Sequence, residues 1–167
     1  MDMGMFPIAV DWKWRMTMSG YRKIAVAIDL SSESDAILKR AADVSAPDGE
    51  IHLIYVQEPM DSVYMGVVPY GPVFVGMDEV EENLRSELRQ KLDDIGEKFN
   101  VPEQARHFIS GTPAREIHKF AEEHSVDLIV LGTHGQKGVQ LLLGATANSV
   151  LHGSSCDVLA VRVFDEV

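Results

Sequence analysis

The sequence predicts an α/β protein with a doubly wound, five-stranded parallel sheet in the order 3-2-1-4-5 and helices on both faces. Five short apolar segments alternate with stretches of helical periodicity, which is the pattern of right-handed β-α-β crossovers. The 167 residues suffice for one domain with its own core. The fourth apolar segment runs into a glycine-spaced loop, and ligands of such sheets bind beyond the carboxyl ends of the strands.

The first two strands are expected at residues 23–29, KIAVAID, and 50–56, EIHLIYV. Between them, a cluster of N-cap residues at 31–34 precedes a helix, and Asp48-Gly49 predicts a turn. The apolar face of this helix is formed by Ile37, Leu38, Ala41 and Ala42.

Residues 57–77 are irregular and rich in Pro, Gly, Met and Tyr. A loop of this length is usually functional or mobile, and a cover for a ligand, a partner-contact loop and disorder all remain open. Residues 78–99 then form the clearest amphipathic helix. Its apolar residues recur at helical spacing: Val80, Leu84, Leu88, Leu92, Ile95 and Phe99.

The second half of the chain supplies the remaining elements. A third strand is expected at 106–110 and a fourth at 128–132, and the helix between them starts at Pro113, a residue suited to the first helical position. The last helix spans 145–152. The fifth strand begins at Asp157 and ends at Val163.

The composition excludes several classes of function. With 26 acidic against 15 basic residues and a net charge of −11, the chain is an improbable binder of nucleic acid or of an anionic membrane surface. No segment approaches the roughly 20 apolar residues that span a bilayer. The single cysteine, Cys156, cannot form a disulfide within the chain, which indicates the cytoplasm.

Residues 1–20 differ from the rest of the chain. They are rich in Met, contain both tryptophans and lack the basic and apolar regions of a signal peptide. We therefore expect a mobile N-terminal extension followed by a single α/β domain at residues 21–167.

The most informative segment follows the fourth strand. Gly132, Gly135 and Gly138 are spaced G-x-x-G-x-x-G, and the last helix begins shortly afterwards. Glycine lets backbone N–H groups approach an anion, and a helix N-terminus favours negative charge. The segment is neither a Walker A loop nor G-x-G-x-x-G. Within it, His134 is placed to reach a phosphate, although a loop histidine is more often simply exposed.

Asp29 stands at the end of the first strand. In the order 3-2-1-4-5, strands one and four are neighbours. The Asp29 carboxylate and Gly132 would therefore lie in the same crevice, beyond the carboxyl ends of these strands. Contact with a ligand and a purely local role as a turn or N-cap acid both remain open. Because Asp29 has no acidic neighbour after strand one, the chain does not match a phosphoacceptor receiver domain. His118, His124 and His152 lie on helices without a matching Cys or carboxylate cluster, which disfavours metal binding.

Four segments carry a resemblance to the universal stress protein family, and within it to the universal stress protein A group. They are KIAVAIDLSSES, IHLIYVQEP, GTPAREI and DLIVLGTHGQKGVQLLLGATANSVLHGSSCDVLAVRV, and the resemblance covers about residues 21–163. It implies an ATP site, with Mg bound only indirectly through the nucleotide.

The resemblance also implies a role for each site residue. Gly132 and Gly135 would line the phosphates, and Asp29 would face the ribose or a phosphate-bound metal. The backbone at Ala27, Val56 and Leu131 would hold the adenine and the sugar. Gly144 and the helix start at Ala145 and Thr146 would cap the phosphates. The chain departs from the family motif in two places: only eight residues separate Gly135 from Gly144, and Ala145 replaces Ser or Thr.

Three functions follow. The first is a cytoplasmic stress-response protein in which an adenine-nucleotide site acts as a regulatory binding module. The second is a dimeric interaction protein with a vestigial pocket and an unidentified protein partner. The third is a slow ATPase or self-phosphorylating protein; it ranks last because no positioned general base is evident, so no catalytic residue is assigned. The apolar last strand lies at the sheet edge, and this position, like the family resemblance, predicts a homodimer through Asp157 to Val163.

Overall fold

The computed structural model describes residues 20–59, 77–133 and 144–162. The expected mobile extension and most of the loop that contains His134 and Gly135 lie outside these ranges, as does most of the irregular segment after strand two.

The described residues form a five-stranded sheet in the order β3-β2-β1-β4-β5, and every neighbouring pair is parallel. The strands are β1 (Tyr21–Ile28), β2 (Ser45–Gln57), β3 (Arg106–Ser110), β4 (Leu128–Gly132) and β5 (Asp157–Val161). The predicted fold class and strand order are therefore confirmed.

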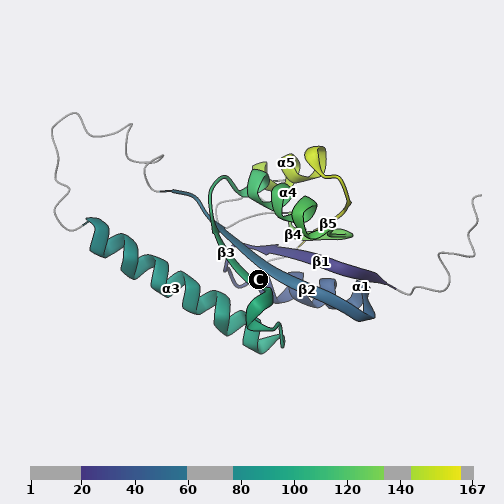
Figure 1. Cartoon of the computed structure of the whole chain (residues 1–167), viewed down its shortest axis with the longest axis horizontal. Helices are drawn as coiled ribbons and strands as arrows, with labels where there is room; N and C mark the ends of the chain where they lie inside the picture. Colours follow the sequence, from purple (N-terminus) through teal and green to yellow (C-terminus); the bar gives the residue numbers. More distant parts are fainter. Residues whose placement is uncertain (1–19, 60–76, 134–143, 163–167) are drawn as a thin grey trace, which may run out of the picture.

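Helices cover both faces of the sheet (Figure 1). On one face lie α1 (Ser34–Val44) and α3 (Met77–Lys98); on the other lie α4 (Pro113–His124) and α5 (Ala145–Gly153). A short 3₁₀ turn, η2 (Glu103–Ala105), leads into β3. In the described ranges no helix is long and apolar enough to cross a membrane.

Alternation along the central strands divides the core into two layers. Ile24, Val26 and Val130 face α1 and α3, whereas Ala25 and Ile129 face α4 and α5. These five side chains are fully buried. Because the sheet is covered on both faces here, β4 and residues 24–28 of β1 form continuous apolar runs, as central parallel strands usually do.

β2 begins earlier than the sequence predicts. It starts at Ser45 and includes Asp48-Gly49, where the sequence indicates a turn. The register shifts here, because Tyr21 pairs with Ser45 but Lys23 pairs with Glu50. A Cβ at Gly49 would lie 2.4 Å from Ser45 Oγ and 2.8 Å from the Tyr21 carbonyl oxygen. The turn residues therefore form an irregularity within the strand, where only glycine fits.

Asp127 fixes the amino-terminal end of the central strand pair. Its Oδ2 accepts hydrogen bonds from the backbone N–H groups of Arg22, at 3.1 Å, and Lys23, at 2.9 Å. Its own N–H donates to the Lys23 carbonyl oxygen at 2.8 Å. This residue sets the register in which Ile24 pairs with Leu128.

We expect Leu92→Ala to lower the free energy of unfolding by about 2–5 kcal/mol, because it leaves a cavity between α3 and the sheet. Leu92 is 2% exposed. The matched control is Leu84→Ala on the same helix, where the side chain is 37% exposed and the loss should stay below about 1 kcal/mol. Urea unfolding followed by circular dichroism measures both. Equal losses would mean that the carboxyl-terminal half of α3 is not packed as described.

Candidate functional site

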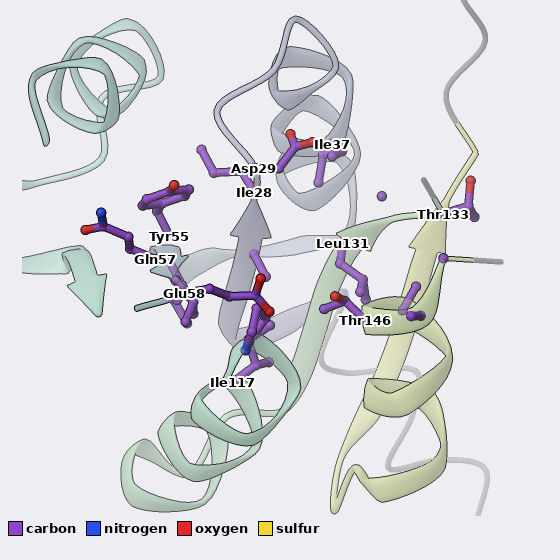
Figure 2. A pocket seen from close by; sticks show the side chains of 18 of the residues that line it. Ile28, Asp29, Ile37, Tyr55, Gln57, Glu58, Ile117, Leu131, Thr133 and Thr146 are labelled. Atoms are coloured by element: carbon purple, nitrogen blue, oxygen red, sulfur yellow. The ribbon is translucent and has the colours of Figure 1, made fainter. Parts of the chain in front are cut away.

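A cleft of about 700 Å³ lies at the carboxyl ends of β1, β2 and β4 (Figure 2). β1 is paired with β2 on one side and with β4 on the other. The chain crosses to one face of the sheet after β1 and to the opposite face before and after β4, so the helices diverge at this edge. This is the switch point at which doubly wound sheets bind ligands.

Eight of the ten site residues predicted from the sequence line this cleft. They are Ala27, Asp29, Val56, Leu131, Gly132, Gly144, Ala145 and Thr146. They come from the ends of three strands and from the start of α5, and are separated by as much as 119 residues in the chain. The other two, His134 and Gly135, lie outside the described residues. The convergence of the eight residues on one cleft supports a shared ligand.

Sequence reasoning missed the side walls of the cleft. On the α1 and α3 side they consist of Ile37 from α1, Leu84 and Leu88 from α3, and Ile28 and Tyr55 from the sheet. On the α4 and α5 side, Pro113, Ile117 and Ala147 complete the wall. In the sequence these residues look like ordinary core positions, and only the packing of the helices brings them to the cleft.

Asp29 is held by its own loop. Its Oδ1 accepts a hydrogen bond from the Ser31 N–H at 3.0 Å, and Leu30 between them adopts a left-handed conformation with φ of 60°. Such a φ is costly for a branched side chain and often occurs at functional sites. The local role that the sequence left open is therefore present, together with a place on the cleft wall.

The loop after β4 is closed at its base. Thr133 donates its N–H to the Val161 carbonyl oxygen at 2.9 Å, and Gly144 donates to the Thr133 carbonyl oxygen at 2.8 Å. The two ends of the loop therefore meet beside the carboxyl end of β4. Gly144 is also the N-cap of α5, so the positive end of that helix dipole lies at the cleft.

A second backbone contact holds the exit of β2. Gly111 donates its N–H to the Gln57 carbonyl oxygen at 3.0 Å, which ties the ends of β2 and β3 together. Its φ is 152°, and a Cβ there would lie 2.7 Å from Oε1 of Glu116. Glycine is required at this close approach.

The described lining of the cleft is acidic. It contains the carboxylates of Asp29 and Glu58, and none of its described residues is Lys, Arg or His. Burial raises the pKa of the Tyr55 phenol, and the negative charges of Asp29 and Glu58 raise it further. An anionic ligand here would depend on backbone N–H groups, the α5 dipole, a divalent cation or loop residues outside the described ranges.

The described residues contain no group of three or more His, Cys, Asp or Glu side chains able to hold a metal ion. Each of the three helical histidines contacts a backbone carbonyl oxygen instead: His118 that of Val150, His124 that of Phe120, and His152 that of Asn148.

Comparison with known proteins identifies the class. Residues 20–162 match the Universal stress protein family, and the chain belongs to this family.

Individual proteins of this family are similar to the chain over most of its length. The chain is 38% identical to universal stress protein A homolog 2 of Coxiella burnetii over 148 residues, which cover 87% of this chain and 98% of the relative. Universal stress protein A homolog 1 of the same organism is 37% identical, with coverage of 84% and 96%. Among solved structures, that of MJ0577 has a TM-score of 0.70 and 25% identity, covering 87% of this chain and 99% of the other. Universal stress protein MJ0577 is from Methanocaldococcus jannaschii.

We expect Asp29→Ala to lower the free energy of unfolding by about 1 kcal/mol, because the Ser31 N–H loses its acceptor. Asp29→Asn should cost less, since its amide oxygen accepts the same bond. Chemical unfolding of both variants measures the difference. If the alanine variant were as stable as the wild type, the turn would not depend on this hydrogen bond.

Proposed function

We propose that the cleft binds an adenine nucleotide, with ATP as the ligand, and that the protein acts as a nucleotide-dependent regulator in the cytoplasm. The observation that carries the proposal is the convergence of Asp29, Gly132 and the start of α5 on one cleft. Family membership supports a role in the stress response.

The position of each element suggests its part in binding. Gly132 and the Gly144-Ala145-Thr146 helix start offer backbone donors and a helix dipole to the phosphates. Ala27, Val56 and Leu131 provide a narrow apolar wall for adenine and sugar. In the sequence, Gly135 and His134 extend the phosphate-facing segment.

The acidity of the cleft gives Mg²⁺ a specific part in this proposal. ATP carries several negative charges, and the described lining offers Asp29 and Glu58 rather than a basic side chain. A cation bound to the phosphates would reverse the interaction with Asp29 from repulsion to attraction. We therefore propose that Mg²⁺ enters with the nucleotide and that Asp29 faces it or the ribose.

A structural neighbour supports the capacity of the fold. A universal stress protein solved in complex with cAMP has a TM-score of 0.55 and 21% identity, covering 86% of this chain and 98% of that one. The likeness concerns the fold, which therefore holds a nucleotide in at least one protein. The ligand of the present cleft is proposed from its own residues.

A dimeric interaction protein is the second candidate, and the sheet edge favours it. β5 is paired only with β4 among the described strands, and Val158, Leu159 and Ala160 are only partly buried. An apolar edge strand invites pairing with another chain. We propose an antiparallel homodimer through this strand, a feature that is compatible with either function and that leaves room for a further protein partner.

We expect isothermal titration calorimetry to detect binding of Mg-ATP to the wild type, and weaker binding in EDTA because the carboxylates then face uncompensated phosphates. Gly132→Val should abolish binding, since its side chain would occupy ligand space. Ala145→Ser should tighten binding by up to about tenfold by restoring a hydroxyl donor.

The two variants serve as opposed controls, because a fold defect explains loss of affinity but not a gain. Absence of heat at millimolar Mg-ATP for the wild type and for Ala145→Ser would reject the nucleotide proposal. The dimeric interaction protein would then be favoured.

The dimer is tested at the residue that faces the open edge. In a parallel pair the N–H and C=O of one residue face the same neighbour. Val161 accepts from Thr133 beside β4, so Ala160 faces outward. We expect Ala160→Pro to convert the dimer to a monomer by removing an outward donor, whereas Ala160→Ser should leave it dimeric. Light scattering at micromolar concentration measures the mass. A monomeric wild type would contradict the proposal.

A further inference from the structure

Three imidazole rings and one phenyl ring form a cluster away from the cleft, on the α4 face of the sheet. We call the rings of His52 on β2, His107 on β3 and His124 on α4 the histidine cluster. The ring centroids of His52 and His107 are 5.3 Å apart, and each lies 6.0 Å from that of His124. Phe120 stacks on His124 at 3.9 Å and contacts His107 at 4.6 Å.

The cluster joins three elements at one edge of the domain. β3 is the edge strand beside β2, and its His107 pairs in register with Ile54. His124 is the last residue of α4. None of the four rings belongs to a residue that lines the cleft, although Ile54, two residues from His52 along β2, does line it. The cluster therefore holds the end of α4 and shares no residue with the candidate ligand site.

The hydrogen bonds of the cluster suit neutral rings. Nδ1 of His52 and Nε2 of His107 are 3.1 Å apart, so one ring donates while the other accepts. Nδ1 of His124 is 3.0 Å from the Phe120 carbonyl oxygen and must donate to it. If both rings of the His52–His107 pair were charged, the two facing nitrogens would both carry hydrogen, and this hydrogen bond would break.

The surroundings of Nε2 of His52 do little to stabilise a charged ring. This nitrogen is buried without a hydrogen-bond partner in the described part of the chain. The nearest carboxylate oxygen, Oε2 of Glu50, is 3.8 Å away, too far for a hydrogen bond. A charged His52 would therefore gain a long-range attraction but no direct bond unless Glu50 moved.

Burial opposes protonation of the pair and is the largest effect lowering the pKa of His52. The negative charge of Glu50 on β2 raises this pKa, whereas the positive charges of His124 on α4 and Lys23 on β1 lower it. Burial, followed by His52 and His124, lowers the pKa of His107 from 6.5 to about 4. The two rings titrate as a coupled pair, so the folded protein takes up the second proton only near this lower value.

We propose that the histidine cluster is a proton-sensitive contact that holds β3 and the end of α4 against β2 at neutral pH and releases them in acid. The unfolded or locally opened chain binds both protons near pH 6.5, whereas the closed form does not. Stability therefore falls as the pH drops from about 6.5 towards 4 and levels off below that. The proposal does not depend on the nucleotide proposal.

Matched substitutions test this contact. His107→Gln keeps hydrogen-bonding capacity but cannot titrate, and His152→Gln makes the same change at an exposed histidine on α5. The test is urea unfolding of the full chain between pH 8 and pH 4.5. Below pH 6.5, each unit by which the pH falls should raise the unfolding constant of the wild type about three- to tenfold more than that of His107→Gln. His152→Gln should follow the wild type.

Hydrogen exchange, corrected for its intrinsic pH dependence, locates the opening. Amides of β3 and the last turn of α4 should lose protection at pH 5.5 relative to those of β4, and should keep it in His107→Gln. Equal pH dependence of the wild type and His107→Gln overturns the proposal, as does equal behaviour of the two variants. Stabilisation of the wild type by added Zn²⁺ at pH 7.5 also overturns it, because the cluster would then be a metal site.

If His107→Gln does not fold, NMR titration of the wild-type imidazole protons decides the question. A second proton taken up by the His52–His107 pair well below pH 6.5 supports the contact. Both rings titrating at or above 6.5 would exclude it.

Discussion

The parallel pairing of β1 with β4 is the constraint on which the rest of the structure depends. It places Ala27 opposite Leu131, so the residues that follow, Asp29 and Gly132, emerge side by side although about a hundred positions separate them. Asp127 fixes this register at the other end of the same pair. A slip by one residue would turn every core side chain to the wrong face.

The crossovers then determine what can lie at that edge. Because α1 and α3 cover one face and α4 and α5 the other (Figure 1), the helices part where β1 and β4 end, and the cleft extends towards both faces. The closed base of the β4–α5 loop brings the positive end of α5 to the same place. The cleft is thus a consequence of topology, and its acidity is a consequence of Asp29 and Glu58.

Much of this architecture could be predicted from the sequence, because strand and helix periodicities are local signals. The bounds of β3 and β4 match the predicted ranges, and the nominated residues of strand ends one, two and four meet at the cleft. The positions of these residues can be read from the glycine spacing and from the points where the apolar strands end. The extension of β2 back to Ser45 was hidden, because Asp48-Gly49 has turn chemistry in any context, and only pairing with β1 makes it part of a strand.

The missed features depend on contacts between distant segments. Tyr55, Leu84 and Leu88 have ordinary core periodicity, and the sequence gives no sign that they border a cleft. His124 has no partner within its own helix that suggests chemistry; its neighbours His52 and His107 come from two strands. The left-handed conformation of Leu30 was equally invisible, since nothing about leucine predicts it.

We propose that the cleft at the end of β1 and β4 holds an adenine nucleotide. A crystal structure of the full chain grown with millimolar Mg-ATP tests it most directly. We expect phosphates at the amino terminus of α5, adenine beside Val56 and Leu131, and Asp29 facing the ribose or the metal. A structure with the cleft empty at that concentration, or with the nucleotide bound elsewhere on the molecule, would contradict it.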